Sequence, residues 1–307
     1  MRQKKERLYL CLWALAVLAL VPMIIGFLPS SVQNEASENT DLPEDVFQNQ
    51  SEDEEIILPD NASAIVQAEL PMNSFINNTK YKVNEKSLKF TKTDFDKNAP
   101  LVLIIHTYGT QSYNKEGFIT PTSTLKSENE KENVICAGKA FAEALEEIGI
   151  KTIHDKTLFD KISYSGAYNL SVNAVREHLN KYPSIKYVVD IQRDSLFNQK
   201  GNCVKTVTNT EKGKTAQIAF IAGSDENGAD FPSWKDNLAL SLKISENLSK
   251  ISKKLSRGVT LNPSGYGQYA SKGFITVKIG TAGNTQTEAE NAAELLAKAF
   301  YSSIRNS

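Results

Sequence analysis

Side chains that can bind a metal or carry a proton follow apolar stretches at three places in the chain. His106 comes directly after the apolar run 101–105, Asp190 begins the polar end of a second run, and Lys278 lies near the end of a third. Histidine and carboxylate side chains are metal ligands and general acids or bases, and a lysine becomes a base only when its pKa is depressed. Because ligands bind beyond the carboxyl ends of strands in open α/β sheets, we expect these residues to form a site at one sheet edge.

A further apolar segment, 150–153, ends at His154, which Asp155 follows. A lone His–Asp pair is more often structural than functional. Together with His106, however, His154 offers the two imidazoles of a metal site that a carboxylate such as Asp155 or Asp190 would complete.

Alternating strand and helix patterns supply the framework for these residues. Continuous runs of branched apolar residues are typical of strands in a parallel sheet, and apolar residues at helical spacing are typical of the helices that cover it. The predicted strands are 101–105, 150–153, 185–191, 217–222 and 273–279, with a short one near 86–91, and the predicted helices are 132–148, 167–181, 234–255 and 287–304. A capping box is predicted at Thr285 and Glu288. The sequence therefore predicts an α/β domain with an open, mostly parallel sheet flanked by helices.

The N-terminal part of the chain has a different composition. Residues 8–28 are apolar and uncharged, and basic residues precede them, which predicts a single transmembrane anchor with residues 1–7 in the cytoplasm. A cleaved signal peptide is the alternative. Residues 29–70 are polar and acidic and are expected to form a disordered spacer. A lead-in segment, 71–98, then precedes the α/β domain at 99–307.

The charge of the chain is unevenly distributed. The net charge is -1, but residues 1–79 carry about -8 and residues 80–307 about +7. A basic domain on an acidic tether suits an anionic surface such as a cell wall, although a solvated surface without a specific partner fits equally well. The three cysteines, Cys11, Cys136 and Cys203, have no spacing typical of a disulfide framework or a structural zinc site.

Six segments of the predicted domain resemble, in order and spacing, the stage II sporulation protein P family. They are Pro100–Tyr113, Gly149–Asp155, Tyr164–Ser171, Pro183–Ser195, Trp234–Leu240 and Gly273–Ala289. The resemblance covers about residues 98–305 together with the layout of anchor and spacer. It implies a membrane-anchored peptidoglycan amidase of endospore-forming bacteria, with a fold similar to the zinc-dependent N-acetylmuramoyl-L-alanine amidases. It also implies cleavage of the bond between muramic acid and L-alanine during septal wall remodelling at engulfment.

The first loop of the family motif is altered in this chain. The family sequence is His-Thr-His-x-x-Glu. Here His106 is kept, but Tyr108 replaces the second histidine and Gln111 replaces the glutamate.

The other two reactive positions of the family are altered as well. Its Asp-Ile-His-Arg-Asp motif has Gln192 in place of the histidine and keeps Arg193, and its acid/base glutamate on the last strand is Lys278. Zinc hydrolysis needs about three good ligands and a carboxylate to move protons. Neutral amides are weak ligands, and an ammonium about 5 Å from a divalent cation costs roughly 7 kcal/mol at an effective dielectric constant of 20. We therefore expect no catalytic residue, no cofactor, and no metal at the family ligand positions His106, Gln111 and Gln192.

These observations favour a degenerate homologue of the sporulation amidase that binds cell wall or scaffolds a septal wall-remodelling complex. Whether it is an enzyme stays open, with inactivity favoured. The expected substrate groove consists of His106, Tyr108, Gln111, Gln192, Arg193 and Lys278. In it, Lys278 would face a substrate carboxylate or carbonyl.

Two other interpretations remain. The main alternative is an active N-acetylmuramoyl-L-alanine amidase with a relocated zinc on His106 and His154, and a third interpretation is a pure protein-interaction role. The expected partners are peptidoglycan, the membrane through the anchor, and other sporulation wall-remodelling proteins, but no nucleic acid. The expected location is the cell membrane, with the C-terminal domain outside the cytoplasm.

Overall fold

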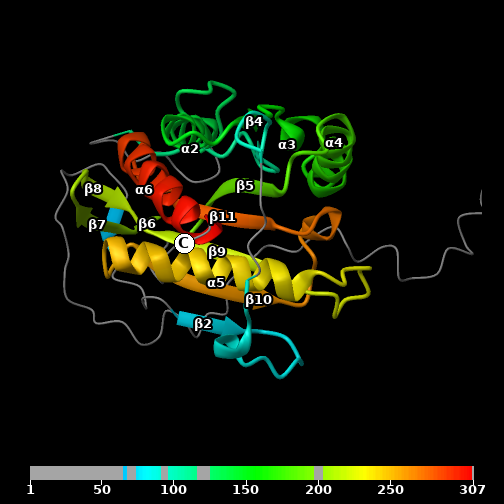
Figure 1. Cartoon of the computed structure of the whole chain (residues 1–307). Coiled ribbons are helices and arrows are strands. Elements are labelled where there is room, and N and C mark those ends of the chain that lie inside the picture. Colours follow the sequence, from blue (N-terminus) through cyan, green and yellow to red (C-terminus); the bar gives the residue numbers. More distant parts are fainter. Residues whose placement is uncertain (1–64, 68–73, 91–95, 116–124, 197–202, 306–307) are drawn as a thin grey trace, which may run out of the picture. The chain divides into compact units, whose positions relative to one another are not determined.

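The computed structural model describes residues 65–67, 74–90, 96–115, 125–196 and 203–305 (Figure 1). All of them belong to one compact unit, Ser51–Ser307. The predicted anchor and most of the predicted spacer lie outside the described residues. Within these ranges, no helix has both the length and the apolar character needed to cross a bilayer.

A seven-stranded sheet forms the centre of the domain. Its strands, in spatial order, are β2 (Ser74–Asn77), β10 (Ser256–Asn262), β9 (Ile218–Gly223), β11 (Phe274–Thr281), β5 (Tyr187–Asp194), β3 (Val102–Ile105) and β4 (Thr152–His154). All neighbouring pairs are parallel except β9 and β11, which are antiparallel. The prediction of an α/β domain with a mostly parallel sheet is therefore confirmed.

The single antiparallel pair divides the sheet into two parallel blocks. Strands β4, β3, β5 and β11 run in one direction, so their carboxyl ends lie along the same edge. That edge carries His154, His106, the end of β5 and Lys278. The topology thus brings together the residues that the sequence placed at strand ends.

Helices cover the sheet on both faces. Helices α2 (Ile135–Glu147), α5 (Trp234–Ile251) and α6 (Gln286–Ile304) share one large apolar core with alternate residues of the strands, and Figure 1 shows α5 and α6 in front of the sheet. Helix α4 (Ala167–Lys181) packs on the other face, where Val175 contacts Leu103 and Ile105. Strands β3 and β5 therefore have apolar side chains on both faces, as their apolar runs predict.

The strand register places the polar residues of β5 and β11 on the α4 face. Asp190 is in register with Ile105, and Gln192 with Lys278. Because alternate residues of a strand point to the same face, all three polar side chains share the face of Ile105. Strand β5 continues beyond its predicted end at Ile191 to Asp194, so Asp190 and Gln192 lie within a strand and not in a loop.

Smaller elements complete the domain. They are β1 (Ile65–Gln67), which pairs with β6 (Cys203–Lys205), the hairpin of β7 (Val207–Thr210) and β8 (Gly213–Ala216), helix α3 (Phe159–Ile162), and the 3-10 turns η2 (Glu85–Ser87) and η4 (Gln268–Ala270). The predicted capping box at Thr285 and Glu288 is confirmed, with both of its hydrogen bonds present.

Two predicted elements differ from the structure. The helix predicted to run to residue 255 ends at Ile251, and β10 follows, which the sequence did not indicate. Strand β10 contains Arg257 and Gly258 among its apolar residues, and this interrupts the pattern that marks a buried strand. The short strand predicted near residues 86–91 is wrong where it is described, because residues 85–87 form a 3-10 turn.

The segment assigned as a lead-in contributes to the sheet. Strand β2 pairs with β10, so the fold includes residues N-terminal to the boundary predicted at residue 99. The ring of Tyr81 also stacks on Trp234 at the start of α5, with ring centroids 5.2 Å apart. Deleting this segment would uncover both the edge of β10 and a buried tryptophan.

We expect Phe75→Ala to lower the free energy of unfolding by about 1–3 kcal/mol, because Phe75 of β2 is partly buried against the main core. Chemical denaturation of the full chain would measure this. Its neighbour Ile76 lies on the opposite face of the same strand and is 38% exposed, so Ile76→Ala is the matched control and should cost clearly less. Equal costs for the two changes would show that β2 does not seal the core.

Candidate functional site

His106 and His154 form a direct imidazole pair at the carboxyl ends of β3 and β4. Their Nε2 atoms are 2.8 Å apart, and His106 Nδ1 lies 2.8 Å from the carbonyl oxygen of Ile191. Since a carbonyl only accepts, His106 carries its proton on Nδ1, and its Nε2 accepts from His154 Nε2–H. The tautomers of both rings follow from this one contact.

Burial keeps both imidazoles neutral. Desolvation lowers the pKa of His106 to about 3, and the proximity of His154 adds to this effect. Burial likewise lowers the pKa of His154 to about 4, with Lys156 contributing. Gly138 of α2 packs directly on the pair, because a Cβ atom there would lie 2.5 Å from His106 Nε2. The helix leaves room for the two rings only through this glycine.

Asp155 does not point toward the two histidines. Its carboxylate accepts hydrogen bonds from Thr157 N at 2.9 Å and from His178 Nε2 at 3.0 Å. Burial acts to raise the pKa of Asp155, but the hydrogen bonds from Thr157 and His178 outweigh it and lower the pKa. His178 of α4 is thus the partner of Asp155.

A continuous hydrogen-bonded chain occupies the centre of the edge. Lys278 Nζ donates to Gln192 Oε1 at 2.7 Å, and Gln192 Nε2 donates to Asp190 Oδ2 at 2.7 Å. The backbone N–H of Thr107 donates to the other oxygen of Asp190 at 2.9 Å. Burial raises the pKa of Asp190 and lowers that of Lys278. The amide of Gln192 therefore links the buried Asp190 to the buried Lys278.

Arg193 is turned inward. Its side chain is buried and donates to the carbonyl oxygens of Ser112 at 2.5 Å and of Leu125 at 2.8 Å, and its backbone N–H donates to Gln111 Oε1 at 3.0 Å. These bonds hold the loop after β3 against β5. Arg193 and Gln111 were both predicted to line a groove. Instead, Arg193 bonds the backbone of the loop after β3, Gln111 of that loop bonds the backbone of β5, and the two together fix the loop.

Tyr108 belongs to a row of four tyrosines. Its ring lies between those of Tyr164 and Tyr168, with centroids 5.3 and 5.5 Å away, and Tyr168 contacts Tyr266 at 5.9 Å. Burial raises the pKa of Tyr108 to about 12, so its phenol stays protonated at neutral pH and is a poor metal ligand. The sequence reasoning missed this row, because its tyrosines come from the loop after β3, the segment before α4, α4 itself and the segment after β10.

These residues do not fit a catalytic zinc. Two imidazole nitrogens on a tetrahedral zinc lie about 3.3 Å apart, so His106 and His154 could open to that distance. Among the described residues, however, no group of three or more His, Cys, Asp or Glu side chains could hold a metal ion. The donor set therefore lacks a third ligand.

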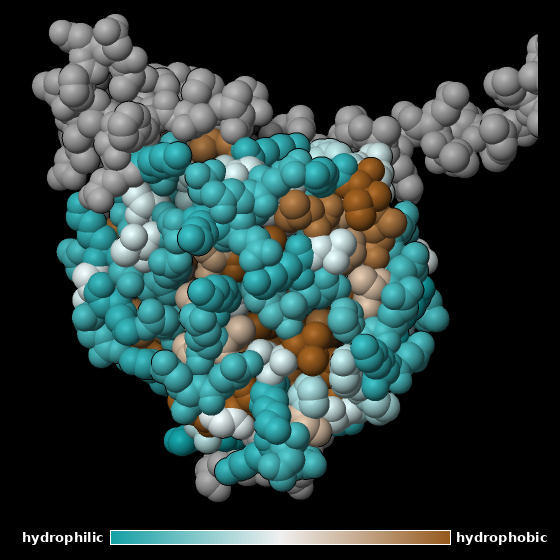
Figure 2. All heavy atoms as spheres, turned by 90° about the horizontal axis from the view of Figure 1, so that it is seen from above, coloured by the Kyte–Doolittle hydropathy of each residue, from teal (hydrophilic) through white to brown (hydrophobic). Residues whose placement is uncertain are grey.

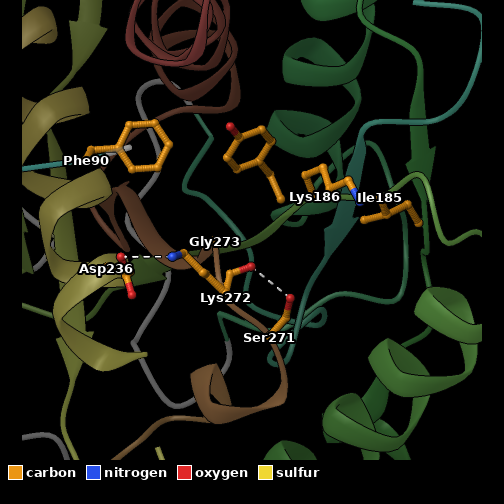
Figure 3. Close-up of a pocket in the computed structure, with 8 residues that line it drawn as sticks. Phe90, Ile185, Lys186, Asp236, Ser271, Lys272 and Gly273 are labelled. Atoms are coloured by element: carbon orange, nitrogen blue, oxygen red, sulfur yellow. Dashed lines mark hydrogen bonds and ion pairs between the residues drawn. The ribbon is translucent and has the colours of Figure 1, made fainter. Parts of the chain in front are cut away.

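Cavities lie away from this centre. One of about 200 Å³, shown in Figure 3, is lined by Ile185, Lys186 and Gly273 among others, at the amino ends of β5 and β11. The ion pair of Asp236 and Lys272 closes one side of it. This edge of the sheet is opposite to the one that carries Asp190, Gln192 and Lys278. The cavity therefore gives a ligand no access to those three side chains.

A second cavity, of about 270 Å³, flanks the loop after β3 and is lined by Thr110, Lys126 and Asp160 among others. It lies beside Tyr164, over whose ring Lys126 Nζ sits at 4.3 Å. Figure 2 looks onto the side of the molecule where α2, α3 and α4 lie, and hydrophilic side chains cover most of it, with hydrophobic spots between them. The most exposed large hydrophobic residues of the described chain are Ile162, the last residue of α3, and Tyr164, two positions later.

Comparisons with solved structures return amidases at low similarity. The N-acetylmuramoyl-L-alanine amidase AmiC2 of Nostoc punctiforme is 14% identical with a TM-score of 0.40, over 68% of this chain and 98% of that one. The CwlD amidase from Clostridioides difficile, in complex with the GerS lipoprotein, is 15% identical with a TM-score of 0.41, over 66% and 96% of the two chains.

Sequence comparisons identify the family. Stage II sporulation protein P of Bacillus subtilis (strain 168) is 28% identical over 214 residues, which are 65% of this chain and 50% of that protein. The chain thus matches about half the length of this curated relative. The family model of stage II sporulation protein P (SpoIIP) matches residues 22–301. With nearly its whole length matched by that model, the chain belongs to the stage II sporulation protein P family.

Proposed function

We propose that this chain is a sporulation cell-wall protein that binds peptidoglycan without cleaving it, and that it scaffolds septal wall remodelling during engulfment. Membership of the family supports the link to sporulation and to the wall. The observation that supports the proposed loss of catalysis is the row of hydrogen bonds that joins Asp190, Gln192 and Lys278. These internal hydrogen bonds use the side chains at a family ligand position and at the family acid/base position.

The chemistry of these side chains supports the proposal. A hydrolytic zinc needs an anionic or imidazole ligand where Gln192 stands and a carboxylate where Lys278 stands. An ammonium at the latter position repels a divalent cation and cannot accept a proton while it is charged. We infer that Lys278 instead faces a carboxylate or carbonyl of the wall peptide.

The alternative function is an active amidase with a relocated metal on His106 and His154. One observation favours this alternative. The two Nε2 atoms lie 2.8 Å apart at the carboxyl ends of β3 and β4. A third ligand would have to come from Asp155 or Asp190. Each is held by other partners, namely His178 for Asp155 and Gln192 for Asp190.

The remaining parts of the proposal concern location and partners. We infer that residues 8–28 anchor the chain in the cell membrane and that the α/β domain lies outside, where peptidoglycan is accessible. The basic charge of residues 80–307 suits an anionic polymer. Other wall-remodelling proteins of sporulation are the proposed protein partners.

We expect the full chain, purified in detergent, to sediment with purified peptidoglycan and to release no peptide from it. Chromatography of the supernatant would detect free stem peptides, and raising the salt concentration should weaken the binding because charge contributes to it. Release of stem peptides that His106→Ala abolishes would instead establish the relocated-metal amidase. Failure to sediment at any salt concentration would contradict both functions.

A further inference from the structure

Arg257 belongs to β10, in the other parallel block of the sheet, but its side chain reaches the edge formed by the carboxyl ends of β5 and β11. Its guanidinium Nη2 contacts Asp194 Oδ2 at the end of β5, although β9 and β11 lie between their strands. The register of β10 is irregular between Ser256 and Gly258, which marks Arg257 as a bulged residue. Bulges re-aim side chains, and this one directs Arg257 along the sheet toward β5.

Gly258 makes this arrangement possible. Its φ is 102°, and a Cβ atom there would lie 1.9 Å from the carbonyl oxygen of Ser74 in β2. Only glycine accommodates both the conformation and the close approach of the neighbouring strand. The bulge is therefore a fixed feature of the edge.

The guanidinium of Arg257 is only partly used. Its side chain is 7% exposed, and among the described residues its Nε–H has no hydrogen-bond partner. A buried donor without an acceptor is costly, so this position calls for a ligand atom. The N–H of a guanidinium donates only to an atom with a lone pair, and an anionic oxygen is the strongest such acceptor.

The charges around Lys278 are unbalanced. Burial is the largest influence on the pKa of Lys278 and lowers it; the nearby charges that also shift this pKa are the carboxylates of Asp194 and Asp190, which raise it, and the guanidinium groups of Arg193 and Arg257, which lower it. When Lys278 is counted with these groups, there are three cationic side chains and two carboxylates. Arg193 donates to carbonyl and hydroxyl oxygens, so it adds a positive charge without a bonded anion. The edge therefore has one surplus positive charge.

We propose that Arg257 and Lys278 together bind one carboxylate of the ligand at the carboxyl ends of β5 and β11. Arg257 supplies its free Nε–H, and Lys278 supplies an N–H other than the one that bonds Gln192 Oε1. Lys278 is partly exposed, so a ligand can approach from its side. This inference rests on the proposed function for the source of the carboxylate, which is a stem peptide of peptidoglycan.

Asp194 makes the proposal distinctive, because its negative charge beside Arg257 repels a ligand carboxylate bound at the free Nε–H. Removing the charge of Arg257 should weaken binding, whereas removing the charge of Asp194 should strengthen it. A purely structural role of the ion pair would instead make both changes harmful.

The test uses calorimetry with the full chain and a soluble disaccharide tetrapeptide from peptidoglycan, with its carboxylates either free or amidated. Arg257→Gln should weaken binding of the free form about tenfold, and Asp194→Asn should tighten it several-fold. Lys272→Gln removes the same charge at the opposite edge of the sheet, where Lys272 pairs with Asp236, and it should change nothing. Amidation should weaken binding to the parent chain and abolish the difference between the parent and Arg257→Gln.

Polyglycerol phosphate, added separately, distinguishes a wall phosphate from a peptide carboxylate. Binding of this polymer in place of the muropeptide would overturn the proposal, as would equal affinity for the free and amidated forms. If Arg257→Gln fails to fold, as judged by circular dichroism, Asp194→Asn decides, and weaker binding by that variant overturns the proposal. Wall binding that persists without dependence on carboxylates refutes this site alone, whereas cleavage of the muropeptide refutes the proposed function.

Discussion

Four substitutions made together are expected to give this chain roughly one bound zinc and an amidase activity that we expect the parent to lack: Tyr108→His, Gln111→Glu, Gln192→His and Lys278→Glu. They rebuild the family's ligand and acid/base positions on an unchanged framework. The parent chain, purified without chelator, should contain substoichiometric zinc. Elemental analysis and the release of stem peptides from peptidoglycan would measure the two effects.

The geometry supports convergence of these positions. His106 Nδ1 bonds the carbonyl of Ile191, Gln192 follows in the strand, and Gln111 Oε1 bonds the backbone of Arg193. Two family ligand positions, His106 and Gln111, therefore contact the backbone of β5 on either side of the third, Gln192, whose side chain bonds Asp190. A carboxylate in place of Gln111 keeps the acceptor for Arg193 N, so this change should be tolerated.

The single change Lys278→Glu is the control. It should not restore cleavage, because the ligands would still be missing, and it should reduce stability by placing a second buried carboxylate near Asp190. Near-stoichiometric zinc in the parent chain, lost on His106→Ala, would contradict the degenerate-site interpretation and favour the His106 and His154 site. A fourfold variant that binds zinc but stays inactive would show that substrate positioning has also been lost.

The sequence predicted the edge but not the contacts across it. Apolar runs located β3 and β5, the segment 273–279 located β11, and the general topology of parallel sheets then brought their carboxyl ends together. The bond between His106 and His154 joins residues 48 positions apart, and no local pattern specifies the distance between two neighbouring strand ends.

Arg257 shows the limit of sequence reasoning more sharply. Its approach to Asp194 depends on a bulge in β10, a strand that the sequence analysis did not predict. The inward turn of Arg193 likewise depends on carbonyl groups of the loop after β3 and of Leu125. Such features arise from the packing of distant segments, which a pattern of hydrophobic residues does not encode.

Lowering the pH from 7 to 4.5 is expected to reduce the free energy of unfolding of the metal-free chain by about 3–5 kcal/mol. In the unfolded chain, His106 and His154 have pKa values near the ordinary 6.5, whereas burial lowers them in the folded chain to about 3 and about 4. Between these values the unfolded state binds more protons, so stability is full above about pH 6.5 and falls as the pH decreases. The raised pKa of Asp190 acts in the opposite direction and reduces the effect.

Urea denaturation of the full chain at pH 7, 6, 5 and 4.5, with a chelator present, would measure this slope. His154→Gln keeps an amide N–H for His106 Nε2 but cannot take up a proton, so it should remove about half of the pH dependence or more. The chain has only three histidines, and His178→Gln, which alters the one bonded to Asp155, should keep the steep loss. A flat profile for the parent would mean that the imidazole pair is not held neutral. A steep profile with chelator that becomes shallow when zinc is added would place a cation between the two rings, since a bound metal competes with protons for the same nitrogens.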